Sequence, residues 1–321
     1  MDDKELLSII IPCLNEESNI QPMYQRLHAV LAAMGCDYEI IFIDDGSRDG
    51  TFERISAVHA LDPKVGGISF SRNFGHQAAL LAGLQYARGA LVITMDGDLQ
   101  HPPEAIPLLA EKFREGYDIV NTRRIDHQET GAFKKLSSGL FYRLMSYLSD
   151  TRVEPSGADF RLMGRKAVDA FLHFPERSRF TRGLVSWMGF RQAVVEYQAA
   201  ARASGHTKYT LSRMARLALD AITSFSSRPL RISFYTGLLV SLLGMAYGLY
   251  IFFSFLSGKT IQGWASLMLT LLIIGGVVLI NLGIVGEYIA RIFNEVKGRP
   301  LYFIKAQAGL EPPQEKTNTH E

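Results

Sequence analysis

Two long uncharged segments near the C-terminal end constrain the fold of this chain more than any other feature. Between Arg231 and Glu287 the one charged side chain is Lys259, which splits the stretch into two apolar runs. Each run exceeds the roughly 20 apolar residues that an α-helix needs to cross a bilayer core. The sequence therefore predicts a membrane hairpin with transmembrane helices at residues 232–258 and 264–288. The alternative is a pair of helices buried in the core of a soluble protein.

Basic residues around the predicted hairpin indicate its orientation. Cytoplasmic loops of membrane proteins carry an excess of Lys and Arg. Arg228, Arg231, Arg291, Lys297 and Arg299 flank the hairpin, whereas Lys259 lies in its turn. Both termini are therefore expected in the cytoplasm. The charged residues 1–5 do not resemble a signal peptide, which agrees with a cytoplasmic N-terminal domain.

The rest of the chain divides by composition. Residues 1–207 are enough for one large α/β domain. Residues 208–231 space apolar side chains among charged ones, which predicts an amphipathic helix lying in the membrane interface, or alternatively a helix packed on the core. Residues 289–306 form a juxtamembrane segment in this scheme. Residues 307–321 lack apolar content and are expected to be disordered.

Net charge and cysteine content argue against two further properties. The formal net charge is +2 at pH 7, whereas a nucleic-acid partner usually requires a strongly basic face. The two cysteines, Cys13 and Cys36, are expected to be buried free thiols, and nothing indicates an oxidising compartment.

Short apolar runs alternate with helical patterns through the N-terminal part of the chain. The runs typical of strands are residues 7–12, 39–43, 65–70, 91–95 and 119–120. Helical spacing of apolar residues is found at 19–34, 50–60, 77–87 and 103–115. This alternation predicts an α/β fold with a parallel sheet covered on both faces. Ligands of such folds bind beyond the carboxyl ends of the strands.

Acidic clusters stand at three of those strand ends. They are Pro12-Cys13-Leu14-Asn15-Glu16-Glu17, Asp44-Asp45-Gly46-Ser47 and Asp96-Gly97-Asp98-Leu99-Gln100. Carboxylates that meet at one edge repel each other unless a cation or hydrogen-bond donors compensate. Asp96, Asp98 and Gln100 can offer oxygen ligands to Mg²⁺ or Mn²⁺, with a substrate diphosphate completing the shell. Taken singly, the second and third clusters could be an Asx turn and an ordinary turn.

Together with longer motifs, these clusters carry a resemblance to a known family. The motifs are the three clusters extended to Thr51 and Pro103, Ser71-Arg72-Asn73-Phe74-Gly75-His76, Gly157-Ala158-Asp159-Phe160-Arg161-Leu162-Met163, and Gly286-Glu287-Tyr288-Ile289 ahead of Arg299-Pro300. Over roughly residues 7–304 the chain resembles the family 2 glycosyltransferases of GT-A (Rossmann-like) fold. Within them it looks like the bacterial polyprenyl-phosphate glycosyltransferases, relatives of bactoprenol glucosyltransferases and dolichol-phosphate mannose synthase.

The resemblance implies roles on the side of a nucleotide sugar donor. Pro12, Leu14 and Glu16 would line the nucleoside pocket, and Asp44 would contact the base or ribose. Asp96 would also contact the ribose-phosphate part of the donor. Asp96, Asp98 and Gln100 would bind the metal. Asp98 is accordingly also expected to be catalytic, together with Asp159 and Arg161.

A lipid acceptor follows from the predicted hairpin, because a polyprenyl phosphate presents an anionic head group at the bilayer surface. Basic residues that could bind it are Arg123, Arg124, Lys134, Lys135, Arg161, Arg202 and Lys208. Any one of them could equally be an ordinary solvated charge. The family pattern favours Arg124, Lys134 and Arg161, together with Arg202 in a loop expected to close over the site.

Asp159 is expected to orient its neighbours rather than to act as a base. Related inverting enzymes place a carboxylate here, but a phosphate monoester has a second pKa of about 6 and is already anionic at neutral pH. We therefore expect Asp159 to position Arg161 or the acceptor and to stabilise positive charge on the sugar. The alternative is a carboxylate that caps the following turn.

The resemblance thus implies inverting transfer of a hexose, glucose from UDP-glucose in the first instance, onto undecaprenyl phosphate at the bacterial inner membrane. An N-acetylhexosamine, an aminoarabinose derivative or mannose is the alternative sugar. A polysaccharide synthase and a catalytically silent membrane scaffold are the alternative functions. Assembly into a homo-oligomer is left open.

Overall fold

The computed structural model describes residues 5–125, 157–176, 181–198, 228–258 and 263–312. These residues fall into two compact units. The sheet unit contains the described residues up to 198 together with those from 299 onward, and the helical unit contains those between 228 and 298.

The described strands of the sheet unit form one mixed sheet in the order β7-β5-β6-β4-β1-β2-β3-β8. Their bounds are β1 Leu7–Cys13, β2 Tyr38–Asp44, β3 Val65–Phe70, β4 Leu91–Thr94, β5 Ile119–Ile125, β6 Gly157–Gly164, β7 Gln192–Gln198 and β8 Ile304–Ala308. The central strands β4, β1, β2 and β3 are parallel, which confirms the predicted α/β sheet. β6 runs antiparallel between β4 and β5, and β8 runs antiparallel along β3.

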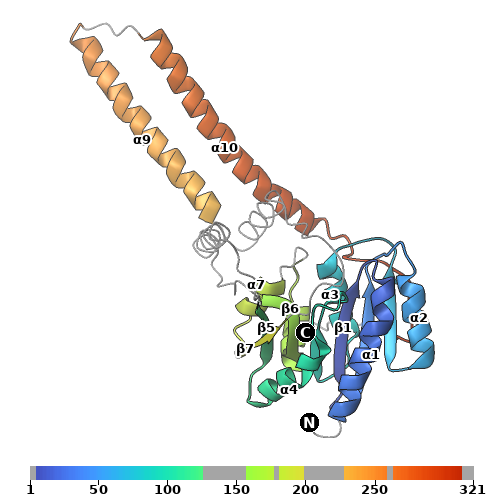
Figure 1. The fold of residues 1–321 in the computed structure, drawn as a ribbon. Coiled ribbons are helices and arrows are strands. Elements are labelled where there is room, and N and C mark those ends of the chain that lie inside the picture. Colours follow the sequence, from blue (N-terminus) through green and yellow to red (C-terminus); the bar gives the residue numbers. More distant parts are fainter. Residues whose placement is uncertain (1–4, 126–156, 177–180, 199–227, 259–262, 313–321) are drawn as a thin grey trace, which may run out of the picture. The chain divides into compact units, whose positions relative to one another are not determined.

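Helices cover both faces of this sheet (Figure 1). They are α1 Glu17–Met34, α2 Thr51–Leu61, α3 His76–Tyr86, α4 Ile106–Arg114, α6 Arg165–Leu172 and α7 Thr181–Trp187, with a short 3₁₀ turn at Pro103–Ala105. Successive strand residues point to opposite faces, so Ile9 and Ile11 of β1 join the cluster under α1 and α4. Ile10 points the other way, and its side chain fills the space beside Gly83 of α3.

Helix α1 shows why the chain folds this way locally. Its buried residues Ile20, Met23, Leu27 and Leu31 recur every three or four positions and form one apolar stripe on the core. The helix ends at Gly35, whose φ of 64° is a left-handed conformation that favours glycine.

The helical unit consists of α9 (Arg228–Leu256) and α10 (Trp264–Val296) (Figure 1). Among the described helices, these two are long and apolar enough to cross a membrane. Their bounds differ from the predicted spans, because α9 begins at Arg228 and ends at Leu256, and α10 continues beyond residue 288. Ser233 of α9 donates a hydrogen bond to Asn281 of α10, the kind of polar contact that links helices in lipid.

The predicted C-terminal boundary was wrong. Residues 304–308, divided in the prediction between a juxtamembrane segment and a disordered tail, form β8 and pair with β3. The physical reason is the edge of the sheet, since β3 would otherwise expose unpaired backbone groups. The segment 208–227, expected in an interfacial helix, and the end of the tail from 313 lie outside the described residues.

Candidate active site

The three acidic clusters meet at one edge of the sheet, where β1, β2 and β4 end. Cys13 pairs with Asp44 at the ends of β1 and β2, and the Met95 amide donates to Ile10 O beside them. Burial raises the pKa of Glu16, and the nearby carboxylates of Asp98, Asp49 and Asp96 raise it further against the bond from Asn19. The clusters are therefore close enough to repel each other electrostatically.

The loops after β1 and β2 are joined by hydrogen bonds. The Asn15 amide donates to Ser47 Oγ at 2.9 Å, and the Arg48 amide donates to Asn15 Oδ1 at 2.9 Å. Asn15 adopts a φ of 55°, an uncommon conformation that is often found at functional sites. Leu14 is 41% exposed on this rim, whereas Pro12 is buried.

Asp44 is only 2% exposed and both of its carboxylate oxygens accept hydrogen bonds. The Ser47 amide donates to Oδ1 at 2.9 Å and the Ser69 hydroxyl donates to Oδ2 at 2.6 Å. The Asp44–Ser47 bond is the turn contact that the simpler interpretation of this cluster expected. Asp44 therefore shapes the loop, and a nucleoside contact remains a prediction.

The loop after β4 brings Asp98, Gln100 and Arg124 into one hydrogen-bonded chain. Asp98 accepts from the Gln100 amide (3.1 Å) and from Gln100 Nε2 (2.5 Å). Arg124, near the carboxyl end of β5, donates from Nη1 to Gln100 Oε1 at 3.0 Å. Gly97 lies directly on β1, because a Cβ there would be 2.9 Å from Cys13 Sγ. The predicted acceptor residue Arg124 thus touches the predicted metal residue Gln100.

His101 contacts Asp96 within the segment that follows β4. The Asp96 amide donates to His101 Nδ1 at 2.9 Å, so the neutral ring carries its proton on Nε2, 3.6 Å from Asp96 Oδ2. Burial lowers the pKa of His101, despite the neighbouring carboxylates. Its ring stacks on Phe160, with ring centroids 5.3 Å apart. His101 is therefore a neutral, fixed neighbour of Asp96 that accepts a hydrogen bond from the Asp96 amide.

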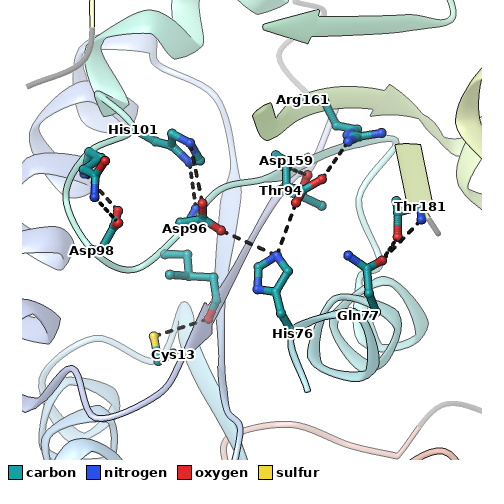
Figure 2. Close-up of polar contacts among 12 residues, drawn as sticks. Cys13, His76, Gln77, Thr94, Asp96, Asp98, His101, Asp159, Arg161 and Thr181 are labelled. Atoms are coloured by element: carbon teal, nitrogen blue, oxygen red, sulfur yellow. Dashed lines mark hydrogen bonds and ion pairs between the residues drawn. The ribbon is translucent and has the colours of Figure 1, made fainter. Parts of the chain in front are cut away.

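A second polar cluster surrounds Asp159 on β6. Thr94, at the end of β4, donates to the Asp159 carbonyl oxygen at 2.6 Å. The Asp159 carboxylate lies 2.9 Å from Arg161 Nη2, 3.3 Å from Arg182 Nε and 3.6 Å from His76 Nε2. Figure 2 shows His76 between Asp159 and Asp96, with its Nε2 also 3.6 Å from Asp96 Oδ1. His76 connects the two clusters.

Neighbouring charged groups shift the pKa values of Asp159 and His76 in this second cluster. Burial alone would raise the pKa of Asp159, but the bond from His76 and the guanidinium groups of Arg161 and Arg182 outweigh it and hold the pKa well below its usual range. Burial alone would lower the pKa of His76, but the Asp159 bond and the charges of Asp96 and Asp159 outweigh it and raise the pKa. Asp159 is therefore a paired anion at neutral pH.

The remaining predicted basic residues have different settings. Arg161 is 2% exposed and is held by Asp159, so it contributes a buried charge rather than a surface one. Arg123 forms an exposed pair with Glu196 at 2.9 Å, as the solvated-charge alternative expected. Lys134, Lys135, Arg202 and Lys208 lie outside the described residues.

Sequence reasoning missed the roles of His76, His101 and Arg182. The two histidines occur within longer sequence motifs, and Arg182 lies in none of these motifs. Arg182 lies on α7, which begins where Thr181 hydrogen-bonds to Gln77 of α3 (Figure 2). Nothing in the spacing of the sequence links α7 to β6, because the contact is made only by folding. For Cys13, the prediction of a buried free thiol is confirmed, and Cys36 is free but only partly buried.

Comparison with known proteins assigns the chain to a family. The model of "Glycosyl transferase family 2" matches residues 8–172, and that of "GtrB C-terminal hairpin" matches residues 228–292. The glycosyltransferase YkcC of Bacillus subtilis is 43% identical over 305 residues, covering 95% of this chain and 94% of that protein. The bactoprenol glucosyl transferase of Shigella phage SfII is 42% identical over 300 residues, covering 93% and 97%. A prophage bactoprenol glucosyl transferase homolog of Escherichia coli is 40% identical over 300 residues, covering 93% and 98%. The protein is therefore a glycosyltransferase of GT-A fold that belongs to family 2 and carries a GtrB-type C-terminal hairpin.

Proposed function

We propose that this enzyme transfers a hexose from a nucleotide sugar, UDP-glucose in the first instance, to a polyprenyl phosphate, with inversion, at the cytoplasmic membrane face. The observation that carries the proposal is the meeting of two unlike clusters at one sheet edge. Carboxylates dominate the first cluster, around Asp96 and Asp98, and cations dominate the second, around Asp159. The relatives named bactoprenol glucosyl transferases, about 40% identical over most of the chain, support the lipid acceptor.

The first cluster suits a cation and a diphosphate. Among the described residues, no three His, Cys, Asp or Glu side chains form a metal site by themselves. Mg²⁺ and Mn²⁺ fit such an edge nonetheless, because these ions accept a few protein oxygens and take the rest from a substrate phosphate. Asp98 and Gln100 would hold the ion with Asp96 beside them, and the ion would stabilise charge on the departing nucleotide. The mutual repulsion around Glu16 supports this fit.

The second cluster suits an acceptor that needs no general base. A phosphate monoester presents an anionic oxygen at neutral pH, with a second pKa of about 6. Asp159, ionised and paired, is placed to hold Arg161 and Arg182 in fixed positions and to offer negative charge near the reacting sugar. Arg124 is exposed and contacts Gln100 of the first cluster, and guanidinium groups suit bidentate phosphate contacts. Lys134 and Arg202 remain proposed acceptor ligands.

The hairpin would keep the enzyme at the bilayer in which such a lipid resides. We place residues 1–207 and both termini in the cytoplasm of a bacterium, from the distribution of basic residues around α9 and α10. Lys259 would then lie outside.

A product assay tests the proposal. Purified enzyme in nanodiscs receives undecaprenyl phosphate and, in parallel, labelled UDP-glucose, UDP-N-acetylglucosamine, UDP-aminoarabinose derivatives or GDP-mannose, with Mg²⁺ or Mn²⁺. A single lipid-linked glucose with inverted configuration supports the proposal. Lipid labelling from another donor alone would reassign the sugar, and a growing polysaccharide would indicate a synthase. Absence of lipid product with every donor would refute the acceptor.

A further inference from the structure

The segment that follows the hairpin lies against a loop of the active site. β8 pairs with β3 through Ile304, opposite Phe70, and Ala306, opposite Ser69. Ahead of β8, the carbonyl oxygen of Phe303 accepts a hydrogen bond from the Ser71 amide at 2.9 Å. Only residues 297–303 separate α10 from β8, so the chain passes from the hairpin directly into this contact.

Two aromatic side chains strengthen the contact. The ring of Tyr302 stacks on Phe70, with centroids 4.7 Å apart and planes 15° apart. Its hydroxyl donates to Gln85 Oε1 of α3 at 2.5 Å, and burial raises the pKa of Tyr302 to about 12, so the hydroxyl keeps its proton. Phe303 packs on Phe74, with centroids 6.2 Å apart. Tyr302 thus ties β3 to α3, and Phe303 contacts the loop between them.

The opposite side of that loop is fixed by the turn after β2. The carboxylate of Asp45 accepts from the Phe74 amide at 2.7 Å and from the Gly75 amide at 3.0 Å. Gly46 permits the close approach, because a Cβ there would lie 2.3 Å from the Arg72 carbonyl carbon, and its φ is 70°. The loop of residues 71–75 is therefore held between two partners, one of which comes from beyond the hairpin.

His76 is the next residue and the first of α3, and its Nε2 lies 3.6 Å from both Asp96 and Asp159. We infer that Tyr302 and Phe303 are positioning residues of the transfer reaction. They hold loop 71–75 so that His76 stays between the carboxylate of Asp96 in the first cluster and that of Asp159 in the second. The active site is thus completed by a segment that the chain reaches only after the membrane hairpin. The inference concerns the place of His76 and rests on the proposed function only for the activity measurement.

The test compares full-length variants in nanodiscs by two independent readouts. Phe303→Ala removes a side chain that is 56% exposed, so it spares the core, and Tyr302→Ala removes the stacking and the bond to Gln85. Lys305→Ala, on the exposed side of the same strand, is the matched control. Hydrogen–deuterium exchange of the peptide covering residues 71–76 should quicken in both aromatic variants and stay unchanged in the control. Exchange of β1 reports whether the fold is intact.

The kinetic readout separates positioning from general destabilisation. We expect kcat to fall roughly tenfold with the KM for the donor changed far less, since a small misplacement of an active-site group suffices for such losses. Tyr302→Phe, which keeps the stacking on Phe70, should retain most of the kcat that Tyr302→Ala loses. In a His76→Gln background, Phe303→Ala should lower kcat by less than about twofold, because residues acting through one another are not additive.

Unchanged exchange in residues 71–76, or losses that simply add in the His76→Gln background, would overturn the inference. If wild-type enzyme forms no polyprenyl product, the proposed acceptor fails, whereas the exchange measurements still decide whether the segment holds the loop.

Discussion

Asp96 and Asp159 lie on either side of His76, yet their surroundings shift their pKa values in opposite directions. Burial, with Asp159 and Asp98 nearby, raises the pKa of Asp96 even though His101 and His76 oppose it. Burial acts on Asp159 in the same sense, but His76, Arg161 and Arg182 overcome it and lower the pKa. Two carboxylates, one just after β4 and one on the adjacent strand β6, thus have opposite pKa shifts because of their neighbours.

Under the proposed function, this difference would let one sheet edge serve two anionic substrates. A crowd of carboxylates attracts a cation and, through it, a diphosphate. A carboxylate already neutralised by guanidinium groups does not need a cation and instead keeps those groups in place.

Asp98→Ala should nearly abolish transfer. If Asp98 helps to hold a divalent cation, its loss removes several kcal/mol of charge stabilisation, which corresponds to about a thousandfold in kcat. Initial rates across a Mn²⁺ titration measure the effect. The control is Glu104→Gln, which breaks an exposed pair with Arg26 away from this edge and should leave the rate unchanged. Full activity of Asp98→Ala, or of wild type in excess chelator, would contradict the metal assignment.

Asp159→Asn should lower kcat by roughly a hundredfold, because Arg161 and Arg182 lose the anion that positions them. The pH profile distinguishes this role from base catalysis. Since the pKa of Asp159 lies below its usual range, the residue stays ionised across the neutral region, so the rise in activity at a pKa of about 6 should come from the acceptor's second ionisation and not from Asp159. The variant should keep that rise, while the ionisation of His76 moves to lower pH, because the bond and charge of Asp159 raise the pKa of His76. A further wild-type ionisation, of neither the acceptor nor His76, that vanishes in Asp159→Asn would instead identify a general base.

The surroundings of Asp98 and Asp159 also differ in how well the sequence predicts them. The first cluster, around Asp96 and Asp98, consists of short motifs at the ends of buried strands. The continuous apolar runs of such strands are readily recognised, and the predicted strands at 7–12, 39–43 and 65–70 lie within or match β1, β2 and β3. The second cluster, around Asp159, is assembled from β6, α3 and α7. Its partner Arg182 is far from Asp159 in the chain, so no local spacing announces the contact.

Strand length was underestimated where one face of the sheet is exposed. β5 was predicted only at residues 119–120, but it continues to Ile125 through Arg123 and Arg124, whose side chains are solvent-exposed. Such residues carry no apolar signal, and their backbone pairing with β7 is visible only in the fold. β8 escaped prediction for a related reason, because its short sequence becomes a strand only beside the free edge of β3.

Arg124→Gln should raise the KM for the polyprenyl phosphate by about tenfold, because a charge-assisted bond to phosphate contributes more than a neutral one. The KM for the donor should change less, although the contact with Gln100 places Arg124 close to both substrates. Arg123→Gln is the matched control on the same strand, since Arg123 pairs with Glu196 in solvent. If Arg124→Gln weakens only nucleotide binding, Arg124 belongs to the donor site and is not an acceptor ligand.

Glu16→Gln should give the smallest effect, a change in stability. It measures most directly the crowding of carboxylates in the first cluster. Burial and the carboxylates of Asp98, Asp49 and Asp96 raise the pKa of Glu16 in the folded protein, so its ionisation disfavours folding. That penalty is absent below the pKa of the unfolded chain, grows as pH rises from that pKa to the folded pKa, and is fully present above it. At pH 7 in chelator, the substitution should therefore stabilise the protein by about 0.5 kcal/mol after solvent screening, seen as a rise in Tm of about 1–2 °C. Added Mn²⁺ with UDP should cancel the gain, because a bound cation already relieves the repulsion. A variant that is less stable in chelator, or equally stabilised with and without Mn²⁺, would mean that carboxylate crowding does not prepare this edge for a cation.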